Sequence, residues 1–343
     1  MSPGEGRGVV NDFLSLCWIM IFDVARQKFS AGLRTLFLFA FMATVALFFD
    51  GEVVQLEMAA PLRGCIDSFA LEYPTLSKLL IFPIIVYSGL RLSRATVRVG
   101  IYSSSSLAAI SLSAVAMFAC VTSENYLATA VVVLLISEVL GRMLYCFGAN
   151  MQLGYLFTSM LALGAMPLVD SALIPVVALL SVVALFVRGT WRETAIVLFG
   201  VATPSFFYCY VMWLLGGDFG ELFVDIWRGV VSPGQDSILA FMTLPHLIFL
   251  GVTALLTLCS VIAYCGVRVT FVDSVRVIWR LLIALIVGLV AMLFLLPSAS
   301  PSIIVAMVLV MTVMLPQLFM RVDVVAATLL YILYALSAFV AIL

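Results

Sequence analysis

Long apolar runs alternate along this chain with short segments that carry arginine. The clearest run, Thr194 to Leu215, follows Arg192 and Glu193 and stops at two glycines. At about 1.5 Å per residue, a helix of this length covers roughly 33 Å and can cross a bilayer core of about 30 Å. Because basic residues beside a span are retained in the cytoplasm, we expect this helix to run outward from its arginine end.

Counting in both directions from this helix predicts about eleven spans, with the N-terminus inside and the C-terminus outside. The spans cover approximately residues 35–49, 79–92, 107–121, 126–140, 153–166, 171–187, 194–215, 238–267, 281–296, 303–319 and 324–343. The run 13–22 is too short to span and is expected at the interface, whereas 238–267 is long enough for two pieces. The sequence therefore predicts an all-α, polytopic transmembrane helix bundle that forms a single integral membrane domain over 1–343. Residues 1–34 would be cytoplasmic or interfacial, and 50–77 and 216–237 would be outer loops.

Composition excludes a soluble fold. The chain is 65% hydrophobic and only 10% charged, against about 25% charged residues in soluble domains. A net charge of −1 argues against a nucleic-acid partner, which would require a basic stripe. The seven cysteines and the single histidine do not have the spacing of metal ligands. The lipid bilayer is therefore the main expected partner.

The charges are distributed unevenly between the two sides of the predicted topology. All but three of the 17 Lys and Arg residues fall on the cytoplasmic side, the exceptions being Arg63, Lys78 and Arg228. Most acidic residues fall outside, although acids contribute little to orientation. Their position indicates that the outer face is the polar working side of the protein.

Asp50 and Glu52 follow directly after the first predicted span. A carboxylate at this boundary can coordinate a divalent cation or act as a general base. The alternative is that these acids only solvate the loop. No cofactor is certain from the sequence, and a divalent cation is the one candidate.

The first outer loop resembles that of the GT-C superfamily of membrane glycosyltransferases. Asp50-Gly51-Glu52 is similar in position and spacing to their acidic motif, and Glu72-Tyr73-Pro74 is similar to the stretch before their next span. This resemblance implies catalytic roles for Asp50 and Glu52, and substrate contacts at Glu72 and Tyr73. It also implies a polyprenyl-phosphate-linked sugar as donor.

The second outer loop carries an acidic helical spacing. Asp218, Glu221 and Asp225 would share one helix face, with apolar residues opposite, which predicts an interfacial helix over 217–230. Arg228 can bind a phosphate in a bidentate manner. Alternatively, it pairs with Asp225 or Glu221.

Two further titratable residues lie in or near predicted spans. His246 follows Pro245, and either transfers protons as a substrate-side group or makes one structural hydrogen bond. Glu138 precedes Arg142 by four residues, which predicts an ion pair near the cytoplasmic interface; a proton relay is the alternative.

Residues from Glu124 to about Asp225 are similar to an uncharacterised family of polytopic inner-membrane proteins from Bacteroidota. The likeness lies in Arg142, Gly154 to Met166, Trp191-Arg192-Glu193 and Gly200 with Thr203-Pro204. It implies the inner (cytoplasmic) membrane of a bacterium and no particular activity.

Three functions remain open from the sequence. The first is a transferase that uses a polyprenyl-phosphate-linked sugar at the periplasmic face. The second is a non-catalytic subunit or scaffold of a cell-envelope complex, with other membrane subunits as partners. The third is a transporter of lipids or small molecules, which the shortage of charge in the middle of the predicted spans disfavours.

Overall fold

The computed structural model describes most of the chain from Phe29 to Ala341. The described residues are 29–50, 60–102, 107–121, 126–147, 153–188, 190–221, 223, 224, 226, 244–295 and 300–341. All regular structure in these ranges is helical. The predicted all-α bundle is therefore confirmed for the described part of the chain.

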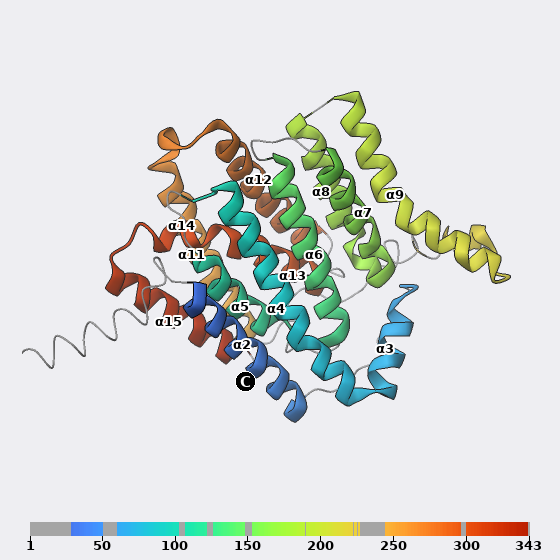
Figure 1. Cartoon of the computed structure of the whole chain (residues 1–343), viewed down its shortest axis with the longest axis horizontal. Helices are drawn as coiled ribbons and strands as arrows, with labels where there is room; N and C mark the ends of the chain where they lie inside the picture. The colour runs from blue at the N-terminus through green and yellow to red at the C-terminus, as the bar shows by residue number, and fades with distance from the viewer. Residues whose placement is uncertain are drawn as a thin grey trace, which may run out of the picture.

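The helices follow one another along the chain (Figure 1). Their bounds are α2 (Phe29–Asp50), α3 (Arg63–Glu72), α4 (Pro74–Val99), α5 (Ala108–Val121), α6 (Tyr126–Phe147), α7 (Leu153–Val169), α8 (Ile174–Arg188), α9 (Trp191–Leu214), α11 (Leu244–Cys265), α12 (Asp273–Leu295), α13 (Ser300–Met314), α14 (Pro316–Phe319) and α15 (Val324–Val340). Two 3-10 turns, η1 (Ser171–Leu173) and η3 (Arg268–Thr270), precede α8 and α12.

Seven described helical segments are long and apolar enough to cross a membrane: α2, α4, α6, α9, α11, α12 and 302–319. Four shorter apolar helices, namely α5, α7, α15 and the segment 171–186, occupy the remaining predicted positions. These helices are those of an integral membrane protein, because lipid is the solvent that such apolar surfaces require.

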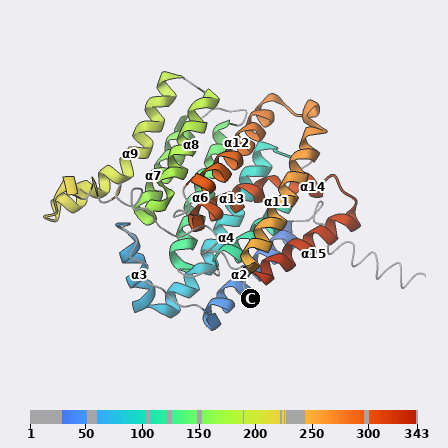
Figure 2. The ribbon, with the colours of Figure 1, turned by 180° about the vertical axis from the view of Figure 1, so that it is seen from behind.

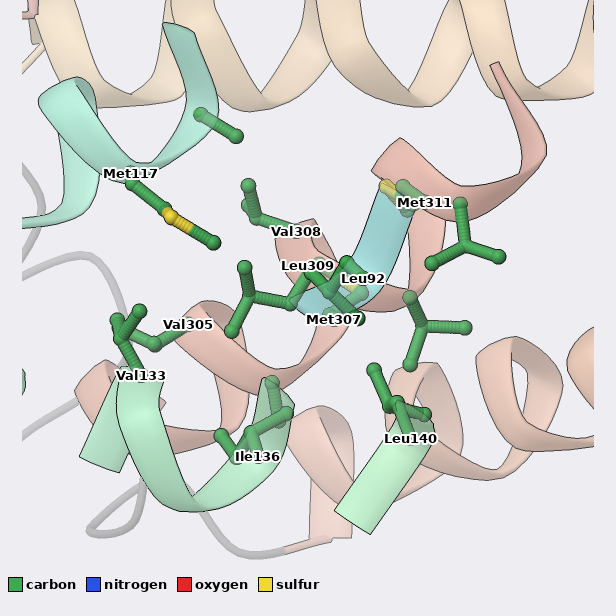
Figure 3. Packing of buried hydrophobic residues seen from close by; sticks show 14 of the residues in the cluster. Leu92, Met117, Val133, Ile136, Leu140, Val305, Met307, Val308, Leu309 and Met311 are labelled. Atoms are coloured by element: carbon green, nitrogen blue, oxygen red, sulfur yellow. The ribbon is translucent and has the colours of Figure 1, made fainter. Parts of the chain in front are cut away.

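The centre of the bundle is formed by α5 and α13. Every residue of α5 is buried, and α13 packs against α5, α6, α11 and α12. Leu92 of α4, Met117 of α5 and Ile136 of α6 surround side chains of α13 (Figure 3). A helix that is apolar on all sides must be enclosed by protein or lipid, and here protein encloses both.

Towards the outside of the bundle, α11 packs against α15, and α7 packs between α6 and α9 (Figures 1 and 2). The contact between α7 and α9 depends on two glycines. A Cβ built on Gly164 would lie 2.1 Å from the carbonyl oxygen of Val201, and one on Gly200 would lie 2.6 Å from the Cβ of Met160. Small residues allow such close helix approach in membranes.

The second predicted span is longer in the structure than in the sequence analysis. Helix α4 begins at Pro74, not near Leu79, and continues past Leu92 to Val99. Proline suits the first turn of a helix, and Gly100, with a φ of 68°, provides the left-handed conformation that ends it. Arginines in the second half of α4 hid this continuation, because they resemble the end of a span.

The first outer loop also contains a helix that was not predicted. Arg63, Asp67 and Ala70 form the buried face of α3, and their spacing places them on one side of a helix. Because two of these three residues are charged, the hydrophobic pattern did not reveal the helix.

Candidate functional site

Three predicted outer residues cannot be placed from the structure. Asp50 is the last residue of α2, but its side chain, and the whole of Glu52 and Arg228, lie outside the described residues. The catalytic and phosphate-binding roles assigned to them therefore stay predictions.

Glu72 and Tyr73 lie where α3 meets α4. Glu72 is the exposed last residue of α3, and Tyr73 caps the N-terminus of α4 with 49% of its surface exposed. The Tyr73 ring lies 5.6 Å from that of Phe69. Both polar groups are thus accessible at this corner, and their predicted contact with substrate remains a prediction.

The two outer segments meet in a small apolar cluster, which we call the outer junction. The backbone N–H of Leu62 donates to the carbonyl oxygen of Leu168 over 2.8 Å, which ties the chain before α3 to the end of α7. Described residues 219–221, 223, 224 and 226 are helical, and Ile226 is 1% exposed. The outer junction consists of Leu62, Leu168, Tyr208, Cys209, Phe219 and Ile226.

Beside the outer junction, α3 carries a buried ion pair. Nε of Arg63 lies 3.6 Å from Oδ2 of Asp67, and the two residues are 7% and 8% exposed. Burial raises the pKa of the Asp67 carboxyl group above its usual value, and the positive charge of Arg63 only partly opposes this.

His246 is the third residue of α11 and is half-buried. It follows Pro245, and proline is favourable at the beginning of a helix. His246 is not part of the outer junction, and it does not line the groove beside Glu138.

A cluster of charged residues lies in the second half of α6 and is centred on Glu138. The carboxylate accepts hydrogen bonds from Nε of Arg142 (2.6 Å), Nε of Arg91 (3.1 Å) and the hydroxyl of Tyr87 (2.5 Å). The predicted pairing of Glu138 with Arg142 is confirmed. Arg91 and Tyr87 were missed, because they approach from α4, and no local spacing reveals that contact.

Helix α6 is longer than the predicted fourth span. Because α6 continues to Phe147 instead of ending near Leu140, Glu138 is roughly 14 Å from the end of the helix, at about 1.5 Å per residue. The position of Glu138 relative to the cytoplasmic interface stays a prediction.

Glu138 and Arg142 line an open groove of about 490 Å³ between α4, α6 and α7, and Arg91 contacts Glu138 beside it. The groove is bounded by Pro83, Ile84, Tyr87, Leu134, Leu135, Glu138, Arg142 and Ala162. Tyr87 is 50% exposed, so the groove opens sideways, toward the surroundings of the bundle. We call this the lateral groove.

The ring of Tyr145 contacts two arginines of α4. The guanidinium carbons of Arg91 and Arg98 lie 5.6 Å and 5.3 Å from the centre of this ring, within the range of cation–π attraction. Two arginines, Arg91 and Arg142, pair with the one carboxylate of Glu138, so this cluster carries excess positive charge.

Within the described ranges, no three His, Cys, Asp or Glu residues are grouped to hold a metal ion. The predicted ligands of a divalent cation are the carboxylates of Asp50 and Glu52, which lie outside the described side chains.

Comparisons with protein-family models, with curated proteins and with solved structures found no match for this chain.

Proposed function

We propose that this integral membrane protein is a transferase that uses a polyprenyl-phosphate-linked sugar at the outer end of its helices, in the inner membrane of a bacterium. The observation that carries the proposal is the outer junction, in which Leu62 of the first outer segment packs with Phe219 and Ile226 of the second. A transferase of this kind requires its two outer segments to converge.

In this proposal, the ends of both outer segments supply the chemistry. Asp50, or Glu52 beside it, takes the proton of the acceptor, because a carboxylate at the water–lipid boundary is a suitable general base. Arg228, two positions after Ile226, holds the leaving phosphate with charge-assisted hydrogen bonds. Glu72 and Tyr73 contact the substrate from the corner between α3 and α4.

The test is transfer from a set of polyprenyl-phosphate-linked monosaccharides by the purified chain in lipid vesicles. We expect Asp50→Asn to abolish transfer with unchanged expression, and Arg228→Ala chiefly to raise the KM for the donor. Asp273→Asn, an exposed carboxylate at the start of α12, is the matched control and should retain transfer. Absence of transfer by the unaltered chain, together with a silent Asp50→Asn in cells, would exclude the proposal.

The second candidate is a non-catalytic subunit of a cell-envelope complex, and α9 favours it. Only 17% of an 18-residue apolar stretch of α9 is buried in the bundle. Phe199, Phe206 and Phe207 are 71%, 59% and 65% exposed. Such an aromatic face is suited to a partner's transmembrane helix as well as to lipid. A photo-crosslinking residue in place of Phe207 distinguishes a partner helix from lipid at this face. A partner subunit gives one discrete protein adduct, whereas lipid contact gives no protein adduct.

A further inference from the structure

We propose that the lateral groove binds the phosphate group of an anionic membrane lipid. Its ligands are Arg142, which lines the groove, and Arg91, which contacts Glu138 beside it. This site is separate from the outer junction and does not depend on the proposed transferase activity.

The geometry of the two arginines leaves donors available for a ligand. The described hydrogen bonds of Arg91 and Arg142 to Glu138 both use Nε, so the terminal nitrogens are not engaged within the described part of the chain. An arginine has five N–H donors in a fixed fork that matches phosphate oxygens. Glu138 therefore holds the two guanidinium groups in place while most of their donors remain open.

The charge of the cluster calls for an anion. Arg91 and Arg142 pair with a single carboxylate, that of Glu138. An uncompensated cation near hydrocarbon is costly, so intramembrane arginines pair with an opposite charge or reach toward the interface. A bound phosphate supplies the missing charge.

The walls of the groove identify the source of the phosphate as a lipid. Pro83, Ile84, Leu134 and Leu135 give an apolar lining beside the charges, and the side chains of Arg91 and Arg142 are 22% and 31% exposed. Acyl chains can therefore lie against the apolar wall while the headgroup meets the guanidinium groups. A free phosphate would gain nothing from this wall.

Gly141 helps to shape the site. A Cβ built on it would lie at ordinary contact distance, 3.5 Å, from Cγ and Nε of Arg91, so the arginine side chain packs directly over this glycine.

The experiment measures binding of a fluorescent phosphatidylglycerol to the full-length chain in nanodiscs of phosphatidylcholine. We expect Arg91→Gln and Arg142→Gln each to weaken binding at least about tenfold, which corresponds to about 1.4 kcal/mol. Arg94→Gln is the matched control, since Arg94 lies on the same helix, is exposed and has no described contact with the cluster. Its affinity should change by less than about twofold.

A third variant separates binding from structural support. Glu138→Gln keeps an acceptor oxygen that can hold the guanidinium groups in place and removes the competing negative charge. We therefore expect this variant to bind phosphatidylglycerol more tightly and to gain more thermal stability from this lipid than the unaltered chain. Inorganic phosphate alone should give no comparable gain.

Three results would overturn the proposal: phosphatidylglycerol binding no better than phosphatidylcholine, Arg94→Gln as damaging as Arg91→Gln, or Glu138→Gln that binds more weakly. Native mass spectrometry of the purified protein that detects a bound partner protein and no bound lipid would also overturn the proposal.

Discussion

At the scale of single residues, Asp67 shows how burial sets the ionic state of a carboxyl group. Its pKa is raised by burial, with Arg63 as a partial counterweight. A carboxyl group whose pKa is higher in the folded state stabilises the fold fully below its unfolded pKa, near 3.8, and loses this contribution as pH rises through the folded pKa. At neutral pH, the buried charge of Asp67 therefore lowers stability.

Asp67→Asn should consequently lose melting temperature relative to the unaltered chain as pH falls through the raised pKa of Asp67, because only the carboxyl group takes up a proton in the folded state. Replacing Asp67 alone also leaves the buried charge of Arg63 without this partner, which costs stability at every pH. Thermal melts of the purified protein between pH 4 and 8 measure this. Asp273→Asn is the control, since Asp273 is 90% exposed in its pair with Arg276 and such pairs contribute little. A difference between Asp67→Asn and the unaltered chain that does not change with pH would contradict the argument.

The residues of the lateral groove show the reach of sequence analysis at this scale. The pair Glu138 and Arg142 follows from helical spacing and was predicted. Tyr87 and Arg91 meet Glu138 across 51 and 47 positions of the chain. That contact depends on how α4 packs against α6, which a single sequence does not encode in any local pattern.

At the scale of elements, the close crossing of α7 and α9 depends on the absence of a side chain at Gly164. Its Cβ position lies against the backbone of Val201, so a methyl group there must separate the helices. Gly164→Ala should destabilise the protein by about 1–3 kcal/mol, the usual cost of overpacking. Denaturation of the purified protein, followed by tryptophan fluorescence, measures it.

Gly154 offers the matched control on the same helix. A Cβ at this position meets no atom within 4 Å, and alanine is up to about 1 kcal/mol more favourable than glycine in a helix. Gly154→Ala should be neutral or slightly stabilising. Equal losses in the two variants would contradict the close crossing as the cause, because helix propensity favours alanine at both positions.

The elements themselves were largely predictable, because apolar runs of sufficient length in a lipid solvent have helix as their main solution. The exceptions have physical reasons. Helix α3 buries two charged residues, so its pattern resembles that of a solvated loop. The second halves of α4 and α6 contain arginine, which a span tolerates when the side chain pairs or reaches the interface.

At the scale of the whole molecule, the enclosure of α5 and α13 was beyond prediction. All apolar runs in this chain have similar compositions, and lipid and protein neighbours are equally apolar. Which runs become central is therefore decided by side-chain packing, as between α13 and its neighbours α5 and α6. The direction of each span depends on charge, and charge is readable from the sequence.

This directional argument is testable with two native cysteines. Cys65 in α3 and Cys265 at the end of α11 are both exposed. Helix α3 and the turn between α11 and α12 lie toward opposite ends of the bundle (Figure 1). Because Arg268 follows α11 closely, the positive-inside rule places Cys265 on the cytoplasmic side and Cys65 on the outer side.

In variants that retain only one of these cysteines, a membrane-impermeant maleimide added to intact spheroplasts should label Cys65. It should label Cys265 only after the membrane is opened. Labelling of both from the same side would mean that an odd number of the assigned crossings between them is wrong, whereas a reversed pattern would invert the whole bundle. Inversion would move the outer junction, and with it the proposed transferase site, to the cytoplasm.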